Sequence, residues 1–331
     1  MGILNNRDNQ FWKDKNVFVT GGAGFIGTWL TRELVDSGAK VSVLVKELPK
    51  RGNFQKLNLE QKTNMIFGDI LDSDSLKLFL DKYNIDTIFH LAAQPLVQLA
   101  YKNPVETLKT NIDGTINILE AGRVNEKIKR IVVASSDKAY GSSDILPYDE
   151  SFSLKGEYPY DVSKSCVDLI AQSYGKTYDL PVAITRLSNV YGGGDLNFDR
   201  IIPETIMHIL NEEDILIRCD GKFKREFFYA KDAAHAYVIL AEKIQELGLK
   251  GEAFNFGMDK PIEILGLVKK IIEISDKPSS KFKILDIAKA EIKDQYLSSK
   301  KAREILKWEP KYTLEEGLKE TYEWYKEYFK K

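Results

Sequence analysis

The stretch Thr20-Gly21-Gly22-Ala23-Gly24-Phe25-Ile26-Gly27 decides the fold of this 331-residue chain. It follows the β-branched run 17–20 and leads into a segment of helical period. Gly21 can take the tight turn, Gly24 lets the backbone approach a pyrophosphate, and Gly27 lets the helix pack closely on the strand. Because a helix N-terminus offers free N–H groups and a partial positive charge, the stretch predicts a dinucleotide site.

Outward from this turn, short β-branched runs alternate with longer segments of helical period. Such alternation is typical of βαβ units that build a parallel sheet. We expect strands at 17–20, 41–45, 65–67, 87–91, 131–135 and 182–186, and crossover helices at 29–37, 73–83, 104–124 and 163–178. The chain is therefore predicted to be α/β, with a Rossmann-type doubly wound parallel sheet.

The alternation stops after Arg186, where 189–200 is rich in Gly, Asn and Asp, as in a functional loop. A helix over 227–246 and a strand over 252–255 are expected to return to the sheet, and an amphipathic helix over 312–329 to end the fold. The expected domains are a dinucleotide-binding domain, 1–188 with 227–256 returning to it, and a smaller α/β substrate-binding domain, 189–226 and 257–331.

Composition and charge narrow the classes of function. Lys and Arg number 48 against 49 Asp and Glu, so no global field favours nucleic acid or an anionic membrane. Cys166 and Cys219 lack metal-ligand spacing and are too few for a disulfide framework, which predicts no metal site and a reducing compartment. Since 1–16 lacks an apolar signal region and no run approaches the ~18 residues of a membrane span, a cytoplasmic protein is expected.

Residues at the ends of later strands extend the predicted cofactor site. Asp69 can accept a hydrogen bond from an adenine amino group, whereas His90 is expected to be structural rather than a base. Lys46 and Arg51 can pair with a 2′-phosphate and Glu47 with a 2′-hydroxyl, so NAD is favoured and NADP stays open. The expected cofactor contacts are Gly21, Gly24, Phe25, Ile26, Gly27, Lys46, Asp69, Ile70, Leu91, Ala92, Ala93, Gln94, Asn111, Ser135, Tyr160 and Lys164.

Two segments carry the predicted chemistry. Tyr160 and Lys164 lie four residues apart and so share one face of the expected helix. There the ammonium can lower the pKa of the phenol and reach the nicotinamide ribose, which makes Tyr160 a usable base. Ser135-Ser136-Asp137-Lys138 ends the fifth strand. Tyr-x-x-x-Lys also occurs by chance as an exposed pair, but after a dinucleotide fingerprint it indicates redox catalysis.

Together these motifs resemble the extended short-chain dehydrogenases/reductases, the family of sugar-nucleotide epimerases and dehydratases. The resemblance runs from Thr20 to the tail segments 306–310 and 314–318. Epimerases of that family usually carry Ser-Ser where this chain has Ser136-Asp137, so the resemblance implies a dehydratase. Ser136-Asp137-Lys138 replaces the usual Thr-Asp-Glu and resembles the CDP-glucose 4,6-dehydratase branch, as do 11–13, 94–97 and 189–195.

The resemblance implies an internal redox cycle that makes a 4-keto-6-deoxy sugar from a nucleotide hexose. Tyr160 takes the 4-hydroxyl proton as hydride passes to the nicotinamide, and Asp137 protonates the departing 6-hydroxyl. Lys138 serves either as the base at C5 or as a cation that stabilises the enolate. The implied catalytic residues are Ser136, Asp137, Lys138, Tyr160 and Lys164, and the implied nucleotide-sugar contacts are Gln94, Ser136, Asn189, Arg200 and Arg225.

Other functions stay open at this point. A sugar-nucleotide 4-epimerase would need Tyr160 and Lys164 but has no evident use for Asp137 and Lys138. A non-catalytic dinucleotide-binding regulator would keep the glycines without needing Tyr160 and Lys164. The nucleotide base is not readable from the residues, and CDP is favoured by resemblance alone. Because 104–124 and 163–178 resemble helices through which the family pairs, a homodimer or a dimer of dimers is expected.

Overall fold

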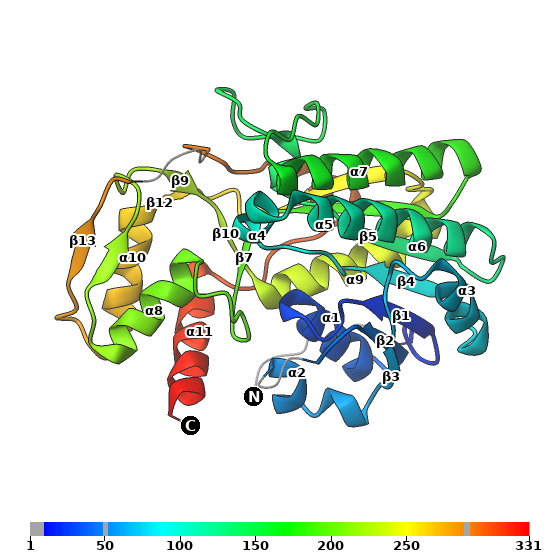
Figure 1. The fold of residues 1–331 in the computed structure, drawn as a ribbon, viewed down its shortest axis with the longest axis horizontal. Coiled ribbons are helices and arrows are strands. Elements are labelled where there is room, and N and C mark those ends of the chain that lie inside the picture. Colours follow the sequence, from blue (N-terminus) through cyan, green and yellow to red (C-terminus); the bar gives the residue numbers. More distant parts are fainter. Residues whose placement is uncertain (1–9, 49–51, 288–291, 331) are drawn as a thin grey trace.

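The computed structural model describes residues 10–48, 52–287 and 292–330. Within them the central sheet has seven parallel strands in the order β11-β6-β5-β4-β1-β2-β3 (Figure 1). Its strands are β1 (Asn16–Thr20), β2 (Lys40–Val45), β3 (Asn64–Phe67), β4 (Thr87–His90), β5 (Arg130–Ala134), β6 (Val182–Leu187) and β11 (Glu252–Phe256). The chain runs outward from β1 to β3 and then returns to the other side of β1, so the predicted doubly wound sheet is confirmed.

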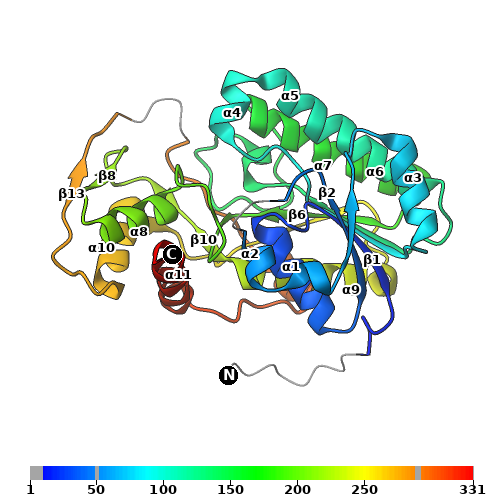
Figure 2. The same cartoon turned by 60° about the horizontal axis from the view of Figure 1, so that its bottom comes forward.

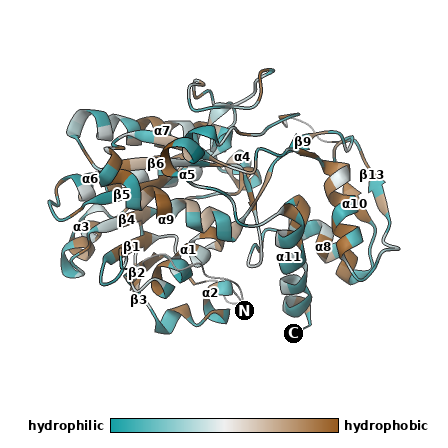
Figure 3. Ribbon diagram, turned by 180° about the vertical axis from the view of Figure 1, so that it is seen from behind, coloured by the Kyte–Doolittle hydropathy of each residue, from teal (hydrophilic) through white to brown (hydrophobic). Residues whose placement is uncertain are grey.

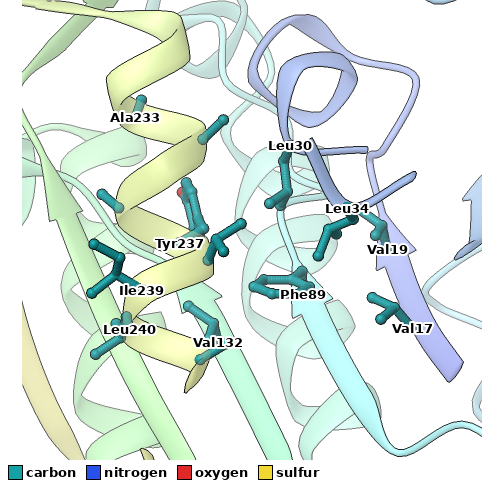
Figure 4. Packing of buried hydrophobic residues seen from close by; sticks show 14 of the residues in the cluster. Val17, Val19, Leu30, Leu34, Phe89, Val132, Ala233, Tyr237, Ile239 and Leu240 are labelled. Atoms are coloured by element: carbon teal, nitrogen blue, oxygen red, sulfur yellow. The ribbon is translucent and has the colours of Figure 1, made fainter. Parts of the chain in front are cut away.

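Helices cover both faces of this sheet because its strands alternate apolar side chains between them. Val17 and Val19 of β1 join one buried cluster, and Phe18 between them joins the other. Figure 4 shows the first cluster, where Leu30 and Leu34 of α1 face the sheet beside the side chains of α9. The covering helices are α1 (Phe25–Asp36) and α9 (Ala230–Leu247) on this face, and α3 (Ser73–Lys82), α6 (Gly114–Arg123) and α7 (Pro159–Tyr178) on the opposite face.

A second group of elements lies beyond the carboxyl ends of the strands. It comprises β7 (Asn189–Tyr191), α8 (Ile201–Asn211), β8 (Ile215–Ile217), β9 (Lys224–Arg225), β10 (Phe227–Tyr229), β12 (Ile262–Glu263), α10 (Ile264–Ile274), β13 (Phe282–Ile284) and α11 (Leu314–Phe329). Figure 2 shows α8, α10 and α11 grouped beside the sheet, and Figure 3 shows hydrophobic segments gathered in α8 and α10. A third buried cluster holds these helices together.

Shorter helices complete the described chain. They are α2 (Asn53–Lys56), α4 (Val97–Lys102), α5 (Pro104–Leu108), the 3-10 helices Leu59–Gln61 and Asp137–Tyr140, and the π-helical turns Lys109–Asp113 and Ala302–Leu306. The helix expected over 104–124 is thus interrupted by a π-helical turn. None of the helices in the part of the chain described here has the length and apolarity required to cross a membrane.

Two other expectations need correction. The helix expected from Phe227 begins at Ala230, because Phe227–Tyr229 is a buried strand that pairs with Asn189–Tyr191. Asn189–Tyr191, expected to lie in a loop, is therefore also a strand. The strand expected over 252–255 is confirmed, since it pairs with β6 and closes the sheet.

Candidate active site

A cleft of about 870 Å³ lies where the strands of the sheet end. Its walls come from the turns after β1, β4, β5 and β6, and from α8, β8 and the segment before β10. Doubly wound sheets bind ligands outside the carboxyl ends of their strands, and this volume is within the usual range for a ligand site.

The turn after β1 leaves room for a phosphate because three of its positions are glycines without side chains. Gly21 has a φ of +70°, and a Cβ there would lie 2.7 Å from the backbone nitrogen of Ala92. A Cβ on Gly27 would lie 2.1 Å from the carbonyl oxygen of Gly21, so α1 could not pack as it does. A Cβ on Gly24 would meet only the Gly21 carbonyl oxygen within 4 Å, which leaves its other side open. The turn therefore has the shape that a dinucleotide pyrophosphate requires.

Buried polar atoms without partners also point to a ligand in the cleft. Ser135 Oγ, Asp137 Oδ2 and Ser188 Oγ are each buried without a hydrogen-bond partner, and all three residues line the cleft. An unpaired buried polar atom costs about 1–3 kcal/mol, so such atoms are normally satisfied by protein or ligand. Their clustering fits a polar ligand such as a dinucleotide or a sugar.

The five predicted catalytic residues all line this cleft. Ser136, Asp137 and Lys138 come from the turn after β5, where the Ser136 hydroxyl accepts the Lys138 N–H at 3.2 Å and starts the 3-10 helix. Tyr160 and Lys164 come from the first turns of α7, which begins with Pro159 at a position where a missing N–H costs nothing. The fold thus brings together two motifs that are more than 20 residues apart in the chain.

Burial is the main influence on the pKa of the Tyr160 phenol. Burial raises the pKa of Tyr160 to about 12, although the charge of Arg200 acts to lower it. The Lys164 ammonium donates to the Ala134 carbonyl oxygen at 2.7 Å, and burial lowers the pKa of Lys164 to about 8. In the protein alone desolvation outweighs the neighbouring charges, and the lowering of the phenol pKa by Lys164 stays a prediction.

Asp137 has the environment of a proton donor. Its side chain is only 2% exposed, and burial raises the pKa of its carboxyl despite the opposing charges of Lys138 and Arg225. Ser136 Oγ donates to Asp137 Oδ1 at 3.1 Å. A carboxyl that is desolvated in this way keeps its proton to higher pH, which suits a general acid.

Five of the residues expected to contact the cofactor do not line the cleft: Lys46, Asp69, Ile70, Gln94 and Asn111. Lys46 and Asp69 form an ion pair at 2.8 Å, so the carboxylate expected to face adenine already has a partner. Ile70 belongs to a buried apolar cluster.

Gln94 and Asn111 support the loop after β4 instead. The Gln94 amide donates to Thr107 Oγ1 at 2.7 Å, and its oxygen accepts the Leu96 N–H. Asn111 donates to Ser163 Oγ at 2.8 Å and accepts the Gln94 N–H at 2.7 Å. The Gln94 side chain is thus engaged within the loop, and its expected contacts with cofactor and substrate stay predictions.

The three remaining residues expected to bind substrate do line the cleft. Arg200 pairs with Asp195 at 2.9 Å, and Arg225 donates to the Lys293 carbonyl oxygen at 2.6 Å. Asn189 donates to the Glu226 carbonyl oxygen at 3.1 Å. Both arginines are thus held in place before any ligand binds.

Sequence reasoning missed several charged residues of the cleft, among them Asp161 and Arg218. Asp161 follows Tyr160 directly, so its place in the cleft could have been predicted from the neighbouring motif. Arg218 directly follows β8 and belongs to no recognisable motif. Arg218 pairs with Glu204 at 2.8 Å across the cleft wall.

His90 is structural, as predicted. It is 3% exposed, and its two ring nitrogens lie 2.8 Å from Thr20 Oγ1 and 3.0 Å from Thr115 Oγ1. Burial lowers the pKa of His90 to about 3, so the ring stays neutral. The buried Cys219 and the half-buried Cys166 are free thiols.

Fold and cleft together place the chain among the extended short-chain dehydrogenases/reductases that act on nucleotide sugars. Comparison with known proteins narrows this class. The chain belongs to the GDP-mannose 4,6 dehydratase family, whose model matches residues 18–321.

Individual relatives agree with this assignment. The chain is 32% identical to the CDP-glucose 4,6-dehydratase of Salmonella typhimurium over 96% of its own length and 92% of the relative. The dTDP-glucose 4,6-dehydratase of Bacillus anthracis, solved with NAD, superposes with a TM-score of 0.83 at 28% identity, covering 95% of this chain and 97% of that one. A UDP-glucose 4-epimerase from Thermotoga maritima, solved with UDP-glucose, gives a TM-score of 0.84 at 27% identity, with 95% and 99% covered.

Proposed function

We propose that this chain is a sugar-nucleotide 4,6-dehydratase that converts a nucleotide hexose into its 4-keto-6-deoxy derivative, with NAD as resident cofactor. The observation that carries the proposal is Asp137, a buried carboxyl with an unpaired oxygen, in the same cleft as Tyr160 and Lys164. Membership of a dehydratase family and the similarity to named 4,6-dehydratases support it. A 4-epimerase has no step that would need this acid.

NAD is the proposed cofactor because the glycine turn suits a pyrophosphate and a similar dehydratase holds NAD. Gly21, Gly24 and Gly27 would hold the pyrophosphate, and Lys164 would reach the nicotinamide ribose. Lys46 is already paired with Asp69, which leaves it less available for the 2′-phosphate of NADP, and Arg51 lies outside the described residues. When bound, the dinucleotide supplies a hydride acceptor at C4 of the sugar and a hydride donor at C6.

The residues of the chain move the protons of this reaction. Tyr160 accepts the 4-hydroxyl proton, and Lys164 orients the reacting groups beside it. The resulting 4-ketone makes the C5 proton acidic. Asp137 then donates a proton to the 6-hydroxyl, which leaves as water. Because no oxidant is consumed, the enzyme needs no second substrate.

Substrate binding is proposed to fall to 189–226 and 257–331, and cofactor binding to 1–188 with 227–256. Arg200 and Arg225 suit the diphosphate, because a guanidinium can donate two parallel hydrogen bonds to phosphate oxygens. Asn189 lines the same cleft. CDP-glucose is the proposed substrate, supported by the similarity to the Salmonella enzyme.

A product assay tests this function. The protein is incubated with CDP-, UDP-, dTDP- and GDP-glucose, and each mixture is examined for loss of water by mass and for a 4-keto product that absorbs in alkali. A dehydratase loses water with at least one of them, and the Tyr160→Phe variant serves as the inactive control. Isomerised sugar of unchanged mass would favour the 4-epimerase, for which the Thermotoga neighbour is the supporting observation. No conversion at all would contradict both activities.

The proposal includes a cytoplasmic homodimer or dimer of dimers, paired through α5, α6 and α7. Exposed apolar side chains on or next to these helices support it, among them Val105, Val124, Leu169 and Tyr178. A strict monomer in light scattering at micromolar concentration would contradict the pairing.

A further inference from the structure

One buried amide joins two proposed catalytic residues of the turn after β5 to the strand β9. Gln295 is fully buried, its Oε1 accepts from the Lys138 ammonium, and its Nε2 donates to the Asp137 carbonyl oxygen at 3.1 Å. The Gln295 N–H donates to the Lys224 carbonyl oxygen at 3.0 Å, and Gln295 forms a β-bridge with Arg225. Gln295 therefore connects the turn that carries Asp137 to the strand that carries Arg225, the residue proposed to bind the diphosphate.

The donors and acceptors around Gln295 leave one orientation for its amide. A lysine ammonium offers three donors and no acceptor, and a carbonyl oxygen offers only an acceptor. The amide oxygen must therefore face Lys138, and its NH₂ group must face Asp137. An acceptor aimed at Lys138 binds the ammonium more strongly than the neutral amine, so this contact favours the charged form.

Charged groups from the neighbouring elements act on the same region. Asp137 lies beside Lys138 in the turn, α7 contributes Asp161, and Glu157, just before α7, adds a negative charge that acts on Asp161. Arg225 from β9 contributes a positive charge near Asp137. Lys138 thus lies near two carboxyl groups, and its positive charge lowers the pKa of both Asp137 and Asp161.

We propose that Gln295 is a positioning residue that holds Lys138 as an ammonium ion, so that Lys138 stabilises the enolate and the Asp161 carboxylate takes the C5 proton. This inference rests on the proposed dehydration. Asp161 is 3% exposed and lines the cleft one residue after Tyr160. Burial raises the pKa of Asp161 to about 6, which still leaves it ionised at neutral pH.

These residues account for each bond and each proton of the elimination. The C5–H bond breaks, the proton passes to Asp161, and the electron pair forms the enolate of the 4-ketone, whose oxygen Lys138 faces as a cation. The C6–O bond then breaks, its oxygen takes the Asp137 proton, and water leaves. When hydride returns to C6, Asp161 gives its proton back to C5, and the carboxylate is regenerated.

The pH dependence of the elimination distinguishes a cation from a base. If Lys138 must be charged, the rate falls at high pH as Lys138 loses its proton. Gln295→Met, which removes the acceptor, should then move this falling limb to lower pH by about one unit, and Gln295→Glu should move it to higher pH. If Lys138 is the base, it must be neutral, and Gln295→Met would instead keep the enzyme active at lower pH.

The test is a single-turnover absorbance trace of the holoenzyme with the nucleotide hexose that the wild type dehydrates. In Gln295→Met, reduced dinucleotide should form at nearly the wild-type rate and disappear about tenfold more slowly. Asp161→Asn should show the same accumulation, because only the C5 base is lost. Gln245→Met, which replaces an exposed glutamine on α9, is the matched control and should behave as wild type.

The outcomes distinguish a failure of this inference from a failure of the proposed dehydration. A falling limb that does not move in either Gln295 variant, or an Asp161→Asn variant that dehydrates at the wild-type rate, overturns the inference and leaves the dehydratase intact. A wild type that dehydrates no nucleotide hexose overturns the proposed function itself. If Gln295→Met melts at a much lower temperature than wild type, Gln295→Glu decides alone, because it retains an acceptor for Lys138.

Discussion

Replacing Asp137 by Asn separates dehydration from oxidation. The amide has nearly the same size as the carboxyl, and its oxygen can still accept from Ser136, which lies 3.1 Å away. It cannot donate a proton to a leaving hydroxyl. Tyr160 and Lys164 are unchanged, so oxidation at C4 should proceed while loss of water is blocked.

The magnitude follows from the surroundings of Asp137. Because burial raises its pKa, a larger share of the wild-type carboxyl carries the proton near neutral pH than an exposed aspartate would. Losing a positioned general acid slows a step by roughly 10²- to 10⁴-fold, or about 2.7–5.4 kcal/mol of barrier. The variant should fold, since it removes a buried ionisable group and keeps the hydrogen bond to Ser136.

The assay is a rapid-mixing trace of the near-ultraviolet band of reduced nicotinamide. In the Asp137→Asn variant the band should rise at nearly the wild-type rate and then persist, whereas in the wild type it stays low. Asp144→Asn, an exposed change in the following loop, is the control and should match wild type. Dehydration by Asp137→Asn at the wild-type rate would refute the role of Asp137 and with it the main reason for preferring a dehydratase.

Three further predictions concern the base, the glycine turn and pH. Tyr160→Phe should abolish turnover and leave dinucleotide binding nearly intact, because the ring still packs and only the proton acceptor is lost; product assay and binding titration check this. Gly27→Ala should cost about 1–3 kcal/mol of folding free energy and weaken dinucleotide binding, because the added Cβ would meet the Gly21 carbonyl oxygen. The control is Gly266→Ala in α10, where a Cβ would make only ordinary contacts. Its melting temperature should therefore stay close to that of the wild type. The pKa of His90 is lowered from 6.5 to about 3, so the stability that its neutral ring contributes is present above pH 6.5 and is lost as pH falls toward 3. Urea unfolding at pH 7 and pH 5 should show a loss on the order of 2 kcal/mol from this group, and His90→Gln should reduce the difference; an equal loss in the variant would assign the effect to other groups.

Local patterns were enough to predict the sheet and most of the catalytic motif. The turn 20–27 needs glycine for reasons of backbone geometry, and β-branched runs alternate with helical ones along the chain, so both can be read without knowing distant contacts. Tyr160 and Lys164 share a helix face, and Ser136 to Lys138 end a strand, so their positions follow from secondary structure. The strand Phe227–Tyr229 was misread because its aromatic residues also suit a buried helix, and only pairing with Asn189–Tyr191 decides between the two.

The sequence by itself therefore determined the fold class and the glycine turn, and it located the residues of the proposed catalytic motif, since these depend on neighbours within a few positions. Only the tertiary structure decided their chemistry. Burial against distant elements sets the pKa of Tyr160 and Asp137, and Lys138 meets Gln295, 157 residues further along the chain. Gln94 forms a hydrogen bond with Thr107 and Lys46 forms an ion pair with Asp69, and neither residue lines the cleft. Desolvation and long-range hydrogen bonds depend on which segments pack together, and no local pattern encodes that.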